Sequence, residues 1–125
     1  MTTTIAVLGS SGSIGTQTLD VVRALPADYR VVALGVATSV DTLVEQAKEF
    51  RPDVVAIGDE VAAAGLAERL PAGTELLVGA DAMAEAAVAG DVVINGVVGF
   101  AGLSVTMATL EAGKRLGLAN KESLI

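Results

Sequence analysis

The feature that most constrains this chain is its start, where a short apolar segment runs directly into a glycine-rich turn. Residues 5–8 read Ile-Ala-Val-Leu, and a continuous apolar run of this length predicts a buried strand. The next residues are Gly9-Ser10-Ser11-Gly12-Ser13-Ile14-Gly15, and residues 14–25 carry apolar side chains at helical spacing. A strand, a glycine turn and a helix in this order are typical of α/β domains that bind nucleotides.

The three glycines of the turn have the spacing G-x-x-G-x-x-G. We expect Gly9 to make the tight turn, Gly12 to admit a pyrophosphate and Gly15 to let the helix pack against the strand. The alternative is a turn that only joins strand to helix, with Ser13 as the N-cap. We favour phosphate binding, because serine hydroxyls alternate with the glycines, but the pattern does not say which nucleotide is bound.

Apolar strand-like segments alternate with helix-like segments along the whole chain. The predicted strands are residues 4–8, 30–36, 54–57, 75–78, 92–95 and 115–119, and the predicted helices are residues 14–25, 40–50, 60–70, 82–89 and 102–112. This alternation predicts a Rossmann-like, doubly wound parallel sheet of about six strands with helices on both faces. At 125 residues, the chain is expected to be one domain, an NAD(P)-binding domain over residues 1–125.

The carboxyl ends of the predicted strands are the places to look for a ligand, because open parallel sheets bind ligands at that edge. These places are residues 9–15, 35–39, 58–60, 95–102 and 120–123.

Composition excludes several other classes of function. Fifteen acidic residues against eight basic ones leave a net charge of −7, which repels nucleic acids and anionic membranes. The chain has no cysteine and no histidine, so thiolate zinc sites and the commonest general base are excluded. Because no segment is long enough to span a membrane and no targeting signal stands at the start, we expect a soluble cytoplasmic protein.

Acidic residues do not suggest a metal site or a catalytic group within this chain. Asp59 and Glu60 are interpreted as capping the start of a helix. Asp81 and Glu85 are interpreted as solvated on a helix face. We therefore expect no metal ligands and no catalytic residues here.

The end of the second predicted strand bears on the choice of cofactor. No acid occurs between residue 35 and Asp41, whereas NAD-binding domains usually place a carboxylate there to hold the ribose. Without a carboxylate at this position, the 2′-phosphate of an NADP cofactor would not be repelled, and the hydroxyls of Thr38 and Ser39 could donate hydrogen bonds to it. Alternatively, Ser39 caps a helix that starts at Val40. Both interpretations stay open, and one residue can do both.

The last residues add a more specific pattern, Leu118-Ala119-Asn120-Lys121-Glu122-Ser123. Together with the first glycine turn, this motif closely resembles the 1-deoxy-D-xylulose 5-phosphate reductoisomerase family, and the resemblance runs over essentially all 125 residues. It implies an NADPH-dependent oxidoreductase that, with a divalent metal (Mn²⁺, Mg²⁺ or Co²⁺), converts 1-deoxy-D-xylulose 5-phosphate to 2-C-methyl-D-erythritol 4-phosphate in isoprenoid biosynthesis. It also implies a homodimer for the full-length enzyme.

The resemblance assigns site residues position by position. It puts the pyrophosphate contacts on Ser11, Gly12, Ser13 and Ile14, the ribose phosphate contacts on Ala37, Thr38 and Ser39, further cofactor contacts on Asn120 and Glu122, and a substrate contact on Lys121. Ser11 stands where the family usually has threonine, which preserves the hydroxyl. The triplet at residues 37–39 replaces a common Gly-Lys-Asn, so a cation for the 2′-phosphate is lost.

Members of that family are much longer than this chain. The resemblance therefore implies that the metal-binding carboxylates, the lid and the dimer-forming regions are absent from it, and that this fragment alone does not turn over substrate. Two alternatives are another NAD(P)-dependent oxidoreductase, which would need a catalytic Cys or His that is absent here, and a non-enzymatic NAD(P)-binding module. We also expect an exposed apolar patch near Phe100.

Overall fold

The computed structural model describes residues 2–118, without the side chains of residues 100 and 118. The strands are β1 (Thr3–Leu8), β2 (Tyr29–Val36), β3 (Val54–Ile57), β4 (Glu75–Val78), β5 (Val92–Asn95) and β6 (Arg115–Leu118). The helices are α1 (Ser13–Ala24), α2 (Val40–Phe50), α3 (Ala82–Ala87) and α4 (Gly99–Glu111), with a short 3₁₀ helix, η1 (Ala67–Arg69).

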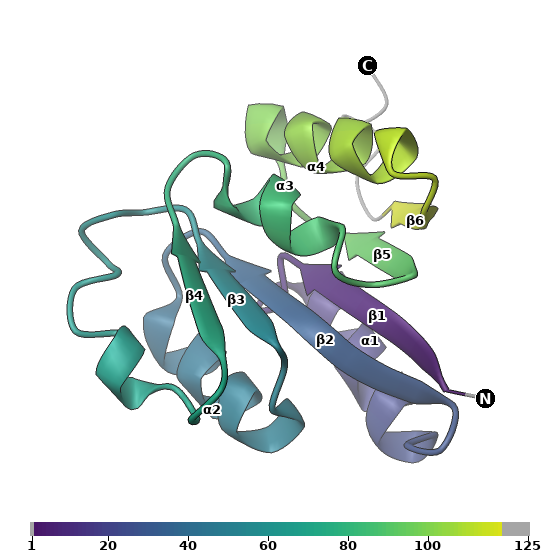
Figure 1. The fold of residues 1–125 in the computed structure, drawn as a ribbon, viewed down its shortest axis with the longest axis horizontal. Coiled ribbons are helices and arrows are strands. Elements are labelled where there is room, and N and C mark those ends of the chain that lie inside the picture. The colour runs from purple at the N-terminus through teal and green to yellow at the C-terminus, as the bar shows by residue number, and fades with distance from the viewer. Residues whose placement is uncertain (1, 119–125) are drawn as a thin grey trace.

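The strands form one six-stranded sheet in the order β4-β3-β2-β1-β5-β6, and every pairing is parallel. The chain starts in the middle of the sheet, builds outward to β4, and then returns to place β5 on the other side of β1 (Figure 1). The strand order therefore reverses between β1 and β5, and ligands of such sheets bind at this switch point. The predicted doubly wound parallel sheet is confirmed.

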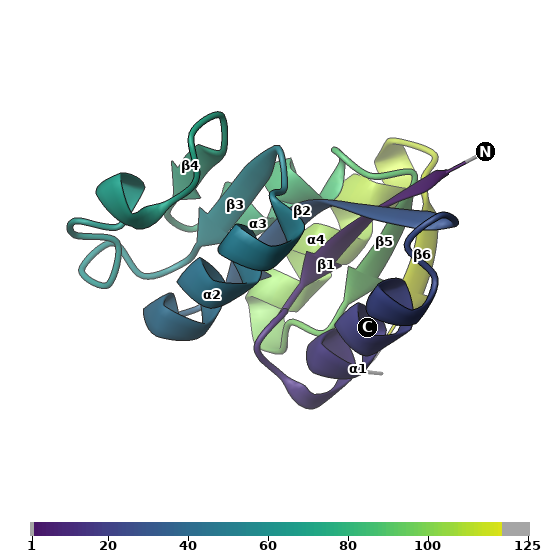
Figure 2. The ribbon, with the colours of Figure 1, turned by 90° about the horizontal axis from the view of Figure 1, so that it is seen from below.

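Helices cover both faces of the sheet. Helices α1 and α2 lie on one face, and α3 and α4 lie on the other (Figures 1 and 2). Successive side chains of a strand point to opposite faces, so Val7 joins the buried cluster under α1 and α2. Its neighbours Ala6 and Leu8 join the cluster under α3 and α4. Apolar residues therefore follow one another without alternation in the central strands, as the sequence suggested.

The predicted helix over residues 60–70 is wrong. The chain forms turns after Asp59, and only Ala67–Arg69 coil into a 3₁₀ helix. The Asp59 carboxylate accepts a hydrogen bond from the Val61 N–H at 2.9 Å, and Gly65 adopts φ +73°. Val61 is 85% exposed whereas Leu66 is fully buried, so the segment still packs on the core, and the turns at Asp59 and Gly65 are what interrupt the helix.

Several predicted boundaries also shift. Helix α1 begins one residue before the predicted start and ends at Ala24, α3 ends at Ala87, and α4 begins at Gly99 instead of residue 102. Helix α4 exposes apolar side chains: Met107 is 48% exposed and Leu110 58% exposed, and Val98, just before the helix, is 69% exposed. The patch predicted near Phe100 centres on a side chain outside the described ones, but these three belong to the same region. No helix within residues 2–118 has the length and apolar character that a membrane crossing needs.

Candidate functional site

The loop after β1 is anchored to the end of β2 and contacts the loop after β5. The N–H groups of Gly9 and Ser10 both donate to the Gly35 carbonyl, at 2.8 and 2.9 Å. Gly9 adopts φ +82°, and a Cβ there would lie 2.8 Å from the carbonyl carbon of Gly96. Glycine is therefore required at position 9 for both its backbone conformation and this close approach. The two loops meet at the switch point of the sheet.

Gly15 allows α1 to pack against the same loop. A Cβ on Gly15 would lie 2.3 Å from the Gly9 carbonyl oxygen and 2.6 Å from the Ser10 Cα. These contacts are far closer than atoms tolerate, so the start of α1 can sit here only with glycine. Gly15 therefore does allow close packing, but the helix packs here against the loop residues Gly9 and Ser10 and not against the strand as expected.

Gly12 differs from both, because the folded chain does not require a glycine there. Its φ is −81°, which any residue adopts, and an added Cβ would meet only the Gly9 carbonyl oxygen, at 3.5 Å. The open space beside Gly12 is part of a cavity that this residue helps to line. A ligand that approaches the backbone closely is a physical reason for glycine at this position.

The start of α1 presents unpaired backbone donors beside this space. Gly12 is the N-cap, no side chain caps the helix, and the Thr16 N–H donates to the Gly12 carbonyl at 2.9 Å. Within the described part of the chain, four nearby N–H groups donate no hydrogen bond, those of Ser11, Ser13, Ile14 and Gly15. Free N–H groups and the positive end of a helix dipole favour an anion.

Neither serine acts as the side-chain cap that the alternative interpretations proposed. Ser13 is the first residue of α1 instead of its N-cap, and its hydroxyl accepts a hydrogen bond from Gln17 Nε2 at 3.2 Å. Ser39 does occupy the N-cap position of α2, but its side chain makes no capping hydrogen bond. The capping alternative is therefore wrong for Ser13, and for Ser39 it holds in position only.

A cavity of about 540 Å³ opens at the carboxyl ends of the strands. Its lining comes from the loops after β1, β2, β3, β4 and β5 and from the start of α4: Gly9, Ser11, Gly12, Val36, Ala37, Gly58, Gly79, Ala80, Asp81, Met83, Gly96, Val97, Val98, Ala101 and Ser104. Four of the five loops named from the sequence thus converge on one cavity. The loop after β4 was missed, although Gly79 follows that strand directly and the same rule applies to it.

The assigned site residues fall into three groups. Ser11, Gly12 and Ala37 line the cavity. Four others are exposed and adjacent in sequence to lining residues, but they do not line the cavity themselves: Ser13, Ile14, Thr38 and Ser39. Asn120, Lys121 and Glu122 lie outside the described residues.

Asn95, the last residue of β5, holds in place the loop that forms one wall of the cavity. It is fully buried, and its Nδ2 donates to the Gly102 carbonyl at 2.8 Å and to the Thr106 hydroxyl at 3.0 Å. Its Oδ1 accepts the Val97 N–H at 3.0 Å. One amide therefore ties the end of β5, the cavity loop and α4 together. The sequence pointed to this loop but did not reveal its connection to Thr106.

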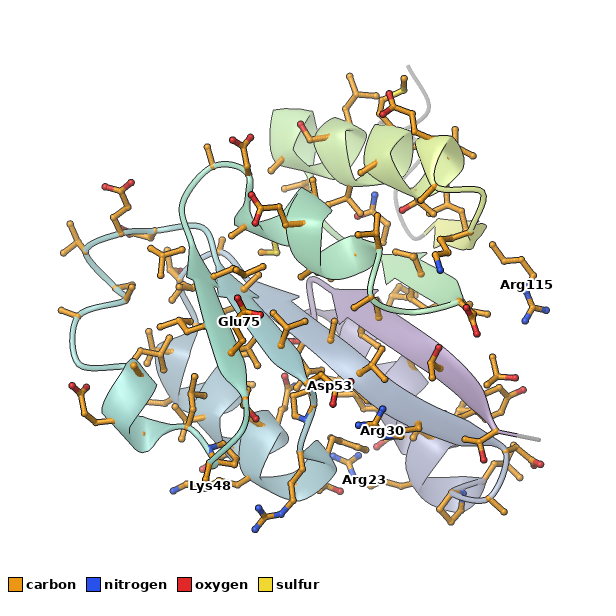
Figure 3. All side chains as sticks on the ribbon, in the orientation of Figure 1. Arg23, Arg30, Lys48, Asp53, Glu75 and Arg115 are labelled. Carbon is orange, nitrogen blue, oxygen red and sulfur yellow. The ribbon has the colours of Figure 1, made fainter. Side chains whose placement is uncertain are left out.

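Within residues 2–118, positive charge lies away from the cavity. Arg30 stands at the start of β2, and Arg23 and Lys48 lie in the last turns of α1 and α2 (Figure 3). The hydrogen bond between Arg23 and Glu49 raises the pKa of Arg23 and lowers the pKa of Glu49.

Among the described residues that line the cavity, the charged residue is Asp81, which is acidic, and there is no lysine or arginine. Asp81 therefore lies at the cavity instead of on a solvated helix face alone. An anion bound in the described part of the cavity would depend on backbone N–H groups and hydroxyls. Residues 2–118 contain no group of three or more acidic, histidine or cysteine side chains able to hold a metal ion.

A parallel sheet with this strand order, and a glycine loop that lines a cavity at the switch point and has N–H groups without partners beside it, define a dinucleotide-binding domain of the Rossmann class. A family model described as 1-deoxy-D-xylulose 5-phosphate reductoisomerase matches residues 5–125. The chain belongs to the 1-deoxy-D-xylulose 5-phosphate reductoisomerase family.

Individual relatives agree with this membership. The reductoisomerases of Crocosphaera subtropica and Mentha piperita are 45% and 46% identical to this chain; each match covers 97% of the chain, but 32% and 27% of those proteins. The solved reductoisomerase from Zymomonas mobilis in complex with NADPH is 38% identical, with a TM-score of 0.92 over 99% of this chain and 33% of that one. The chain thus spans about a third of the length of the relatives it matches.

Proposed function

We propose that this chain is the NADPH-binding domain of a 1-deoxy-D-xylulose 5-phosphate reductoisomerase. The observation that carries the proposal is the loop of residues 9–15, where Gly9, Ser11 and an unobstructed Gly12 line a cavity at the switch point and four N–H groups have no partner in the described structure. The similar structure from Zymomonas mobilis was solved with NADPH, which supports this cofactor.

The proposed contacts follow the family assignment. Ser11, Gly12, Ser13 and Ile14 would hold the pyrophosphate, Ala37, Thr38 and Ser39 the ribose phosphate, and Asn120 and Glu122 other parts of the cofactor, with Lys121 on the substrate. NADPH, when bound, supplies a hydride. The described residues of this chain bind and orient it through backbone N–H groups, and Gly9, Gly15 and Asn95 hold the loops that do so.

The proposed activity of the whole protein is the rearrangement and reduction of 1-deoxy-D-xylulose 5-phosphate to 2-C-methyl-D-erythritol 4-phosphate, by a homodimer that uses a divalent metal. A solved reductoisomerase that is 40% identical was crystallised with magnesium, which supports a metal for the whole protein. The cytoplasmic location stays a prediction.

Separate titrations of NADPH and NADH into the 125-residue chain test the proposal. We expect saturable binding of NADPH, detected by isothermal calorimetry. The absence of a cation in the described cavity lining, with Asp81 present there, favours NADH as a second candidate cofactor. Tighter binding of NADH would correct the cofactor, and failure of both to bind would overturn the function.

A steady-state assay tests the proposal that the chain is a cofactor domain. With sugar phosphate, Mn²⁺ and NADPH, we expect the isolated chain to form no product. Robust product formation would refute the division of labour proposed for residues 1–125.

A further inference from the structure

A glutamine side chain from α2 reaches the back of the glycine loop. Gln46 is buried, with 7% of its surface exposed, and its Nε2 donates to the Ser10 carbonyl oxygen at 2.9 Å. Ser10 is itself fully buried. The contact therefore joins α2 to the backbone of the loop in the interior of the domain, 36 residues away in sequence.

This contact completes a set of hydrogen bonds that decides which way the loop's polar groups point. The Gly9 carbonyl accepts the Gly12 N–H at 3.1 Å, and the Ser10 carbonyl accepts Gln46. Both carbonyl oxygens, which would repel a phosphate, are thus occupied within the protein. The N–H groups that follow are left without partners in the described structure, as an anion-binding loop requires.

The other end of the Gln46 amide has no partner within the described structure. Its Oε1 is buried and accepts no hydrogen bond within the described structure, which destabilises a fold. Its helical neighbours Leu43 and Ala47 are buried and apolar, so an apolar side chain would suit the core at least as well. The bond from Nε2 to the loop remains the reason for an amide at this position.

We propose that Gln46 is a positioning residue of the dinucleotide site: it holds the Ser10 carbonyl inward and so keeps the N–H groups of the loop aimed at the pyrophosphate. The inference rests on the proposed binding of NADPH. It adds a residue outside the cavity lining to those that determine cofactor affinity.

The Gln46→Met variant tests this proposal, because methionine has a similar length and no donor. We expect the Kd for NADPH to rise at least tenfold, whereas the Kd for adenosine 2′-phosphate, which lacks a pyrophosphate, changes less than twofold. Amide hydrogen exchange at Ser10 and Gly12, whose N–H groups are hydrogen-bonded within the fold, should accelerate in the ligand-free chain. Glu45→Met, the same change at an exposed neighbour on α2, should leave all three measurements unchanged.

Three outcomes would overturn the inference: unchanged NADPH affinity in Gln46→Met, equal losses for both ligands together with a lower Tm, or unchanged exchange in the loop. Gln46→Glu provides a second variant, because it puts an acceptor against the Ser10 carbonyl, and it should weaken NADPH binding at least as much. If the unaltered chain bound no NADPH, the proposed function would fail instead, and loop exchange in the ligand-free variants would still decide whether Gln46 anchors the loop.

Discussion

Replacement of Gly12 by alanine should separate cofactor binding from stability. The new Cβ would make one ordinary contact, at 3.5 Å from the Gly9 carbonyl oxygen, and would otherwise stand in the cavity. Alanine is a poorer N-cap than glycine, which destabilises the fold by up to about 1 kcal/mol. It also lowers the conformational entropy of the unfolded chain, which stabilises the fold by about 0.4–1 kcal/mol. These effects oppose each other, so the free energy of unfolding should change by less than about 1 kcal/mol.

The effect on binding should be much larger. A methyl group beside the four unpaired N–H groups would hold a pyrophosphate away from them. We expect NADPH affinity to fall at least tenfold, which is about 1.4 kcal/mol of binding free energy.

Gly15→Ala provides the contrast, because its Cβ would meet backbone atoms at 2.3 and 2.6 Å. Backbone atoms cannot swing away, so α1 and the loop must separate. Because the contacts are with backbone, we take the upper part of the usual cost of overpacking, about 2–3 kcal/mol, and the gain in helix propensity recovers about 1 kcal/mol. We expect a net loss of about 1–2 kcal/mol in the free energy of unfolding, together with weaker NADPH binding.

Urea unfolding and NADPH titration of the two variants, beside the unaltered chain, supply both quantities. The reasoning would be refuted if Gly12→Ala bound NADPH as tightly as the unaltered chain. It would be equally wrong if Gly15→Ala unfolded at the same urea concentration as the unaltered chain.

Two further predictions concern stability. Asn95→Leu removes three hydrogen bonds, two of them buried and one part-buried; at about 0.5–1.5 kcal/mol each, urea unfolding should show a loss of roughly 1.5–4.5 kcal/mol, and an unchanged midpoint would contradict the bracing role. Because Arg23 lowers the pKa of Glu49, their pairing stabilises the fold above the ordinary pKa of a glutamate. This contribution is lost as the pH falls from about 4.5 through the lowered value. Glu49→Gln should therefore lose stability less steeply than the unaltered chain on acidification, and the difference should shrink in high salt; parallel urea midpoints across this range would count against the pairing.

The local sequence pattern predicted the sheet correctly, but it predicted a helix wrongly in one connection, residues 60–70. Continuous apolar runs predicted central strands such as β3, whose four residues are all buried, because burial on both faces requires apolar side chains throughout. Residues 60–70 have helical composition, but the Asp59 carboxylate and Gly65 turn the chain instead. A side-chain hydrogen bond of this kind competes with helix formation and is not visible in periodicity.

The candidate site was predictable where it depends on strand ends and glycines, and not where it depends on tertiary contacts. The roles of Gly9 and Gly15 follow from their spacing. The hydrogen bonds of Gln46 and Asn95 do not, because each joins backbone from a different element and leaves no trace in local spacing. The motif at residues 118–123 was the most specific sequence signal, and nearly all of it lies outside the described residues.

The central claim is that the loop of residues 9–15 binds the pyrophosphate of a dinucleotide through its N–H groups. Backbone amide NMR of the ¹⁵N-labelled chain, titrated with NADPH, tests this most directly. The account predicts the largest shift changes at Ser11, Gly12, Ser13, Ile14 and Gly15. Saturable binding that left these amides unmoved, with changes confined to other elements, would contradict it.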